Sequence, residues 1–89
     1  MEQSAIIEEL KSFFIDELFV DLSASEIKAD MRLRDHLGID SLGFTELLAY
    51  IEDQYQISVE EEEFIPENFR TIYSIVRFIE SKTANANIS

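Results

Sequence analysis

The stretch HLGIDSLGF, residues 36–44, contains the chain's only two glycines and its only histidine. Gly38 permits a tight turn, and the Asp40-Ser41 pair that follows consists of two residue types favoured at the start of a helix. From Ser41 to about Gln56, apolar residues recur at helical spacing. The stretch therefore predicts a junction between a loop and a helix, with Ser41 at the helix start.

The residues leave three roles open for Ser41. It can be a helix cap, which is the ordinary role of a serine at such a position. It can be a catalytic nucleophile. Against this role, His36 is the only candidate base and no G-x-S-x-G motif is present. A short helical chain also has little room for a substrate cleft. It can also be an attachment point, because a phosphodiester there would lie at the positive end of the helix dipole.

Two further helices are predicted on either side of this junction. One covers roughly residues 3–20 and the other begins at Thr71, which is placed as its cap. Their apolar stripes are Ile6, Leu10, Phe13, Phe14 and Leu18 in the first, and Ile72, Ile75, Val76 and Ile79 in the last. Residues 1–82 form a single domain in this interpretation, and 83–89 a flexible tail.

The segments that connect these helices carry weaker signals. A polar connection of about twenty residues precedes Ser41, and its isolated apolar residues are expected to anchor it to the core. Ser23 and Glu26 have capping-box spacing, as do Ser58 and Glu61, so a short helical turn is predicted at each place. Pro66 predicts a further turn. The fold class is therefore all-α.

The helix that begins at Ser41 has two distinct faces at about 100° per residue. The core-facing stripe is centred on Phe44, with Leu48, Ile51, Tyr55 and the flanking Leu47. On the opposite face, Leu42 and Ala49 lie among the carboxylates of Glu46 and Asp53. An apolar spot with an acidic rim suits a partner protein that has an apolar dimple and a basic rim.

Composition excludes several classes of function. A net charge of −12 opposes binding to nucleic acid and to anionic lipid surfaces, and favours basic protein partners. The absence of cysteine excludes a disulfide framework and a cysteine nucleophile, and one histidine makes no zinc site. No signal peptide and no apolar run of about 18 residues is present, so we expect a cytoplasmic protein without a membrane segment. We also expect the protein to be a monomer.

LGIDSLGFTELLAYIEDQYQISV resembles the phosphopantetheine attachment region of acyl carrier proteins, with its G-x-D-S-[LM] core and acidic helix. The resemblance extends over about residues 5–82, including LRDHLGID and FRTIYSIVRFIE. It implies an all-α four-helix bundle of three main helices and a short third one, with a long loop between the first two helices.

The same resemblance implies a carrier and not an enzyme. A phosphopantetheinyl transferase would attach 4′-phosphopantetheine from coenzyme A to Ser41, flanked by Asp40 and Leu42. The arm would hold an acyl or aminoacyl group as a thioester and present it to loading enzymes and downstream synthases or transferases with basic docking surfaces. Leu42, Glu46, Ala49 and Asp53 match the family's partner-recognition positions.

Departures from fatty-acid carriers bear on the pathway. Gly43 replaces a common acidic residue, Phe44 fills a position often held by a smaller one, and the segment at 60–69 is longer. These features resemble discrete carriers of polyketide, nonribosomal peptide or related specialised metabolism. A discrete aminoacyl or peptidyl carrier, a primary fatty-acid carrier and an unmodified acidic docking module remain the alternatives.

Overall fold

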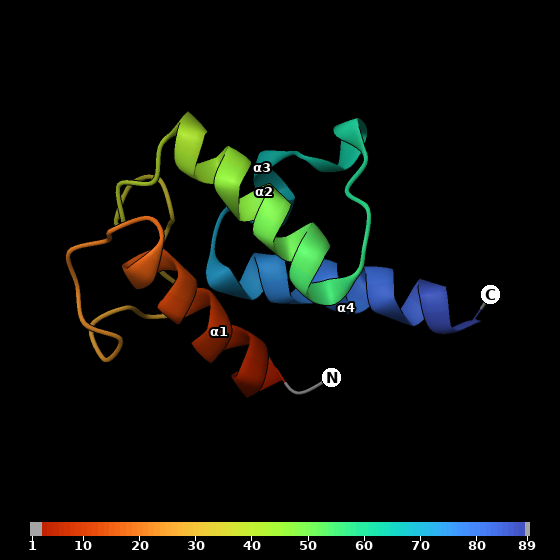
Figure 1. The fold of residues 1–89 in the computed structure, drawn as a ribbon, viewed down its shortest axis with the longest axis horizontal. Coiled ribbons are helices and arrows are strands. Elements are labelled where there is room, and N and C mark those ends of the chain that lie inside the picture. The colour runs from red at the N-terminus through yellow and green to blue at the C-terminus, as the bar shows by residue number, and fades with distance from the viewer. Residues whose placement is uncertain (1–2, 89) are drawn as a thin grey trace.

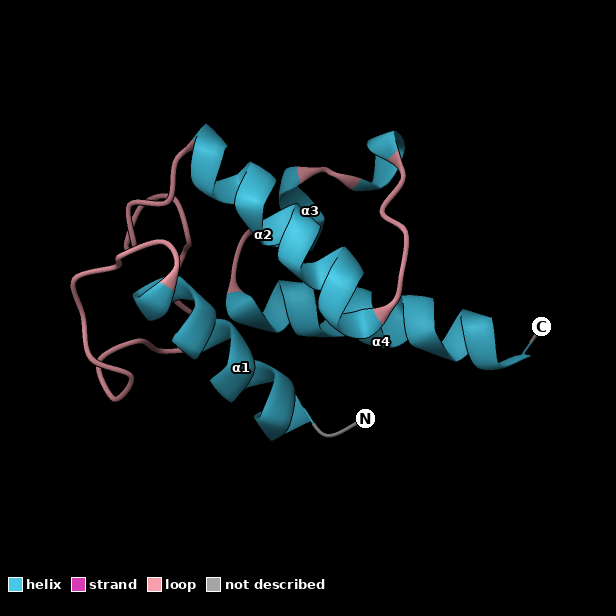
Figure 2. Cartoon of the chain, in the orientation of Figure 1, coloured by secondary structure: helices cyan, strands magenta, loops and turns pink. Residues whose placement is uncertain are grey.

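A computed structural model describes residues 3–88, with side chains up to Thr83. Four α-helices and one 3₁₀ helix follow one another along the chain (Figures 1 and 2). They are α1 (Gln3–Asp16), α2 (Ser41–Tyr55), the 3₁₀ helix (Glu61–Glu63), α3 (Pro66–Phe69) and α4 (Ile72–Ile88). The described part of the chain has no strand, so the predicted all-α bundle with a short third helix is confirmed.

Helix α4 is the centre of the bundle, because α1, α2 and α3 all contact it. In Figure 1 α4 runs along the long axis of the molecule, with α2 crossing in front of it. The predicted stripes of α1 and α4 are buried, apart from Leu18, which lies beyond the end of α1 and is half-buried. Beside the core, the Tyr55 hydroxyl donates a hydrogen bond to the Glu9 carboxylate and so links α2 to α1.

Helix α1 ends at Asp16, earlier than the predicted residue 20. The backbone N–H of Leu18 bonds the carbonyl of Phe13, five residues back, which widens the last turn. Phe19 then adopts a left-handed conformation with φ of +57°, so the helix cannot continue through it. The apolar spacing up to Leu18 predicts a longer helix, because the spacing of apolar residues does not show where the backbone changes direction.

The connection between α1 and α2 contains turns and no helix, and four of its aliphatic side chains are buried. These are Ile27, Leu33, Leu37 and Ile39. Leu33 donates its N–H to the carbonyl of Arg70, and Tyr73 donates its N–H to Ala29, which ties the connection to the start of α4. The predicted anchoring of this segment to the core is confirmed.

The buried face of α2 is rotated from the predicted one. Gly43, Leu47 and Ile51 are its buried residues, whereas Phe44, the expected centre of the stripe, is half-buried. A Cβ at position 43 would lie 2.9 Å from Cγ2 of Ile39. Gly43 is therefore explained by the close approach of the connection, and position 43, where fatty-acid carriers commonly have an acidic residue, lies on the buried face of α2.

The predicted caps have mixed outcomes. Ser23 donates its backbone N–H to the Glu26 carboxylate at 2.9 Å, but only a turn follows. The cap expected at Ser58 is wrong, because the backbone N–H of Glu60 bonds the Glu63 carboxylate and sets the start of the 3₁₀ helix two residues later. Thr71 caps α4 as predicted, its hydroxyl accepting from the N–H of Ser74 at 3.1 Å.

The last helix is longer than expected. We predicted a tail from residue 83, whereas α4 continues to Ile88, and Ser89 lies outside the described residues. The Thr83 hydroxyl donates to the backbone carbonyls of Ile79 and Glu80, and no glycine or proline follows to end the helix.

We predict that Gly43→Val lowers the free energy of unfolding by about 1–3 kcal/mol, because the added side chain collides with Ile39 under the first turn of α2. Urea denaturation followed by circular dichroism measures the change. Ala49→Val is the matched control, since Ala49 is exposed on the same helix. Equal effects of the two substitutions would contradict the proposed close approach.

Candidate functional site

The junction at residues 40–41 divides two tasks between neighbouring side chains. Asp40 is the N-cap of α2, and its carboxylate accepts a hydrogen bond from the N–H of Gly43 at 2.9 Å. Ser41 is the first residue of the helix and is exposed. Its hydroxyl takes part in none of the side-chain hydrogen bonds formed among residues 3–83. The interpretation of Ser41 as the cap is therefore wrong, and its hydroxyl is open to solvent.

His36 forms no hydrogen bond with Ser41 in the part of the chain whose side chains are described. Its Nδ1 accepts a hydrogen bond from the backbone N–H of Arg32 at 2.8 Å, so this nitrogen is occupied within the connection. A serine hydrolase needs a histidine nitrogen directed at the serine hydroxyl. Among the described residues, moreover, no group of His, Asp or Glu side chains could hold a metal ion. The contact of Nδ1 with Arg32 therefore gives no support to a catalytic triad at Ser41.

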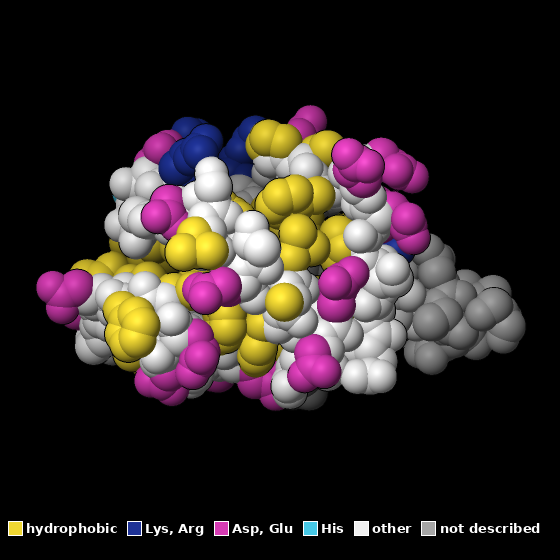
Figure 3. All heavy atoms as spheres, turned by 45° about the horizontal axis from the view of Figure 1, so that its top comes forward, with side chains coloured by type: hydrophobic (Ala, Val, Ile, Leu, Met, Phe, Trp, Pro, Cys, Tyr) yellow, Lys and Arg dark blue, Asp and Glu magenta, His cyan; other side chains and the backbone are white. Residues whose placement is uncertain are grey.

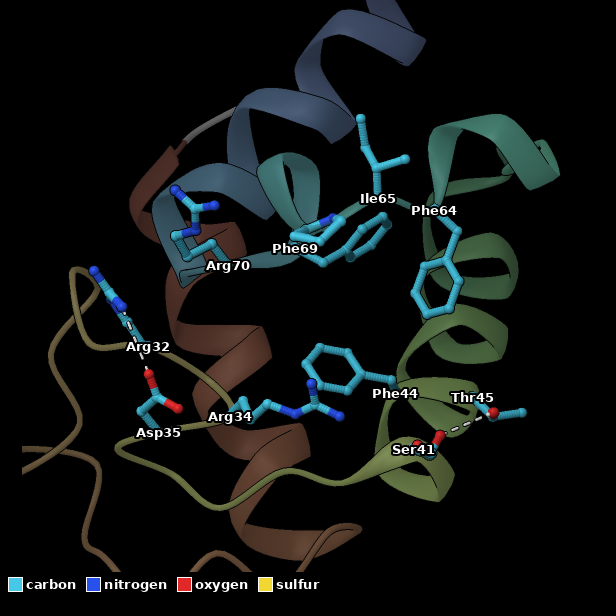
Figure 4. Close-up of a pocket in the computed structure, with 11 residues that line it drawn as sticks. Arg32, Arg34, Asp35, Ser41, Phe44, Thr45, Phe64, Ile65, Phe69 and Arg70 are labelled. Carbon is cyan, nitrogen blue, oxygen red and sulfur yellow. Dashed lines mark hydrogen bonds and ion pairs between the residues drawn. The ribbon is translucent and has the colours of Figure 1, made fainter.

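An open pocket of about 450 Å³ lies beside Ser41, between the start of α2, the connection and the segment around α3 (Figure 4). Its lining combines aromatic, aliphatic and charged side chains. They are Arg32, Arg34, Asp35, Ser41, Phe44, Thr45, Phe64, Ile65, Pro66, Phe69 and Arg70.

Aromatic rings form one wall of this pocket. Phe64 contacts Phe44 edge-on, with ring centroids 6.4 Å apart, and Phe69 at 5.2 Å. Phe69 is buried in the core, whereas Phe64 and Ile65 keep 43% and 40% of their surface exposed. Phe44, which fills a position often held by a smaller residue in fatty-acid carriers, lines the pocket. Phe64 and Ile65 were not predicted as site residues, although an apolar pair directly after an acidic run was a usable signal.

The segment that carries Phe64 and Ile65 is held to α4 by polar contacts. The Lys82 ammonium lies 2.9 Å from the Glu63 carboxylate, and the Asn68 amide donates to the Glu63 carbonyl at 2.7 Å. The Lys82 ammonium and the backbone N–H of Glu60 hold the pKa of Glu63 below its ordinary value. The acidic run at 60–63 thus begins a short helix, and Glu63 also has a structural partner in Lys82.

The four residues proposed for partner recognition share one exposed face of α2. Leu42 keeps 68% of its surface exposed, and Glu46, Ala49 and Asp53 are exposed as well. Figure 3 shows acidic side chains spread among small apolar patches over this side of the molecule, with basic side chains gathered at one edge.

Comparison with known proteins identifies the kind of site. The family model described as "Phosphopantetheine attachment site" matches residues 8–79. The chain belongs to the acyl carrier protein family. An acyl carrier protein of Solidesulfovibrio magneticus is 31% identical over 78 residues, which cover 88% of this chain and 95% of that protein. One from Onion yellows phytoplasma is 33% identical over 78 residues, covering 88% of this chain and 97% of that protein.

Membership of this family defines the general activity. The chain is an acyl carrier and not an enzyme, and its cofactor is a covalently attached 4′-phosphopantetheine. Its partners include a phosphopantetheinyl transferase and enzymes that handle acyl groups. Among residues 3–88, no helix combines the length and the apolar character needed to cross a membrane.

We predict that Asp40→Ala lowers the free energy of unfolding by about 1 kcal/mol, because the N–H of Gly43 loses its acceptor. Asp40→Asn keeps an acceptor and should lose less. Ser41→Ala is the control, and its stability should stay close to that of the parent chain. Urea denaturation measures both changes. If Ser41→Ala lowers the free energy of unfolding as much as Asp40→Ala does, the assignment of the cap to Asp40 alone is contradicted.

Proposed function

We propose that Ser41 carries the 4′-phosphopantetheine arm of this acyl carrier, with Asp40 and Leu42 as the residues that flank it. The observation that supports this proposal is the exposed Ser41 hydroxyl at the first position of α2, left unengaged because Asp40 provides the cap. The arm supplies the thiol that forms the thioester with the cargo. The chain itself has no cysteine that could do so.

The local chemistry fits such an attachment. Asp40 accepts from the N–H of Gly43, and its carbonyl accepts from the N–H of Phe44. The N–H groups of Ser41 and Leu42 precede the first intrahelical hydrogen bond and have no acceptor within the helix. A negatively charged phosphodiester is stabilised at this end of a helix. No other residue needs to move for Ser41 to be reached from solvent.

The outward face of α2 is proposed as the docking surface for the transferase and for the acyl-handling enzymes. Leu42 and Ala49 supply apolar contact, and Glu46 and Asp53 supply negative charge around them. Partners with a basic rim would be attracted by this charge and oriented by the apolar spot. The face adjoins Ser41, so a docked enzyme would have the arm within reach.

We further propose that the carrier serves specialised metabolism, such as polyketide or nonribosomal peptide synthesis, with an acyl or aminoacyl cargo. Phe44 and the segment at 60–69, which depart from fatty-acid carriers, both line the pocket beside Ser41. Because these departures from fatty-acid carriers lie at a pocket next to the attachment residue, they favour a cargo other than a fatty-acid chain. A monomer acting in the cytoplasm belongs to the same proposal, and a primary fatty-acid carrier is the main alternative.

Modification of Ser41 is tested by mass spectrometry of the intact protein. Incubation with coenzyme A and a permissive phosphopantetheinyl transferase should add the mass of one phosphopantetheine group. Ser41→Ala should show no gain, because the hydroxyl is the acceptor, whereas Ser74→Ala, which alters a serine in α4, should be modified fully. A folded parent chain that gains no mass would contradict the proposal and would favour an unmodified docking module.

Docking through α2 is tested by charge reversal. Glu46→Lys with Asp53→Lys should slow modification of Ser41 by at least about tenfold at low salt, because steering of a basic partner is lost. Glu61→Lys with Glu62→Lys changes the net charge equally but lies in the 3₁₀ helix. The difference between the two double variants should shrink at high salt. Equal rates for both at low salt would argue against the α2 face.

A further inference from the structure

We propose that the pocket beside Ser41 selects a cargo with an apolar body and a carboxylate at its far end, and that the positive charge of Arg34 and Arg70 attracts this carboxylate. The inference rests on the proposed attachment at Ser41 and defines the chemical class of the cargo. It is carried by the juxtaposition of an aromatic wall, a group of arginines and the attachment residue in one pocket (Figure 4).

The distribution of charge is the first argument. The chain has 19 acidic and 7 basic residues, yet three of the basic residues line this one pocket with a single acid. Arg32 forms an ion pair with that acid, Asp35, at 3.6 Å. Arg34 and Arg70 have no carboxylate partner among the described residues. In a chain of net charge −12, a pocket with two unpaired arginines, one beside Ser41 and one at the opposite end, attracts an anion more strongly than the rest of the surface does.

The aromatic wall is the second argument. Phe64 and Ile65 are among the few large apolar side chains of the described chain that are substantially exposed, and both face this pocket. Figure 4 shows Phe44 and Phe64 on the α2 side and Phe69 deeper in the pocket, with Arg70 and Arg32 at the opposite end. An occupant that covers the rings with an apolar body would thus have the guanidinium group of Arg70 available to its other end.

The position of the attachment residue is the third argument. Ser41 lines the pocket, and Arg34 extends from the connection toward Phe44 and Ser41. A cargo on an arm tethered to Ser41 can turn back into the pocket without leaving the protein. Tethering raises the effective concentration of the cargo, so even one exposed ion pair biases it toward the pocket.

The test measures the pKa of the carboxylate at the end of the cargo. Ser41 is loaded with an arm that carries an eight-carbon dicarboxylic acyl group, its terminal carboxylate labelled with ¹³C, and the label is titrated by NMR. Pairing with the arginines should lower this pKa by about 0.5–1 unit relative to the same arm free in solution, a three- to tenfold change in proton affinity. A carboxylate that stays outside the pocket would show an unchanged or raised pKa, because the surrounding chain is acidic.

Substitutions assign the effect to the arginines. Arg34→Gln with Arg70→Gln should return the carboxylate pKa to the value of the free arm. Arg77→Gln is the matched control, since Arg77 is exposed on α4 outside the pocket. Circular dichroism shows whether each variant retains its helices. A matching arm with a neutral eight-carbon acyl group should shift the amide signals of residues 64–70 equally in the parent chain and in the double variant.

Two results would overturn the proposal. One is a carboxylate pKa at or above that of the free arm in the parent chain. The other is a double variant that changes only the ³¹P signal of the arm, which would assign the arginines to the phosphodiester. Because the chain has no cysteine, Ser41→Cys offers a single thiol to which the same arm can be attached chemically. The measurement therefore remains decisive even if enzymatic modification of Ser41 fails.

Discussion

The arrangement of the bundle depends on the burial of four aliphatic side chains that belong to no helix. Ile27, Leu33, Leu37 and Ile39 draw the long connection between α1 and α2 into the core. Each such burial is worth about 1.5–3 kcal/mol. The last of the four lies under the first turn of α2 and requires a glycine there. The connection thus fixes where α2 begins and which of its faces is turned toward solvent.

The functional junction illustrates how two adjacent residues can have separate physical tasks. The carboxylate of Asp40 stabilises the helix start, and the hydroxyl of Ser41 is left without a structural role. An attachment residue that also capped its helix would have to give up that hydrogen bond when modified. Here the structural and chemical demands fall on different side chains, so modification of Ser41 leaves the cap of α2 in place.

Sequence patterns predicted the number and order of the main helices, the buried connection and the exposed face of α2, because these follow from the periodic spacing of apolar residues. The predictions made from these patterns were wrong where tertiary contacts override the local pattern. The left-handed backbone at Phe19 ends α1 early, and the approach of Ile39 rotates the buried face of α2 toward Gly43. The arginines of the pocket were missed for a similar reason: Arg34 and Arg70 are distant in the sequence and line one pocket only because the N–H of Leu33 bonds the carbonyl of Arg70.

The part of the aromatic pocket wall that precedes α3 is held in place by other contacts than those that hold α1, α2 and α4 together. Phe69 anchors it in the core, but the stretch before α3 is held to α4 by the partly exposed ion pair between Glu63 and Lys82. Contacts of this kind are individually weak in water. Salt screens such an ion pair, and acid removes it when Glu63 is protonated. The position of the stretch before α3 therefore depends on solution conditions to which the buried apolar packing of α1, α2 and α4 does not respond.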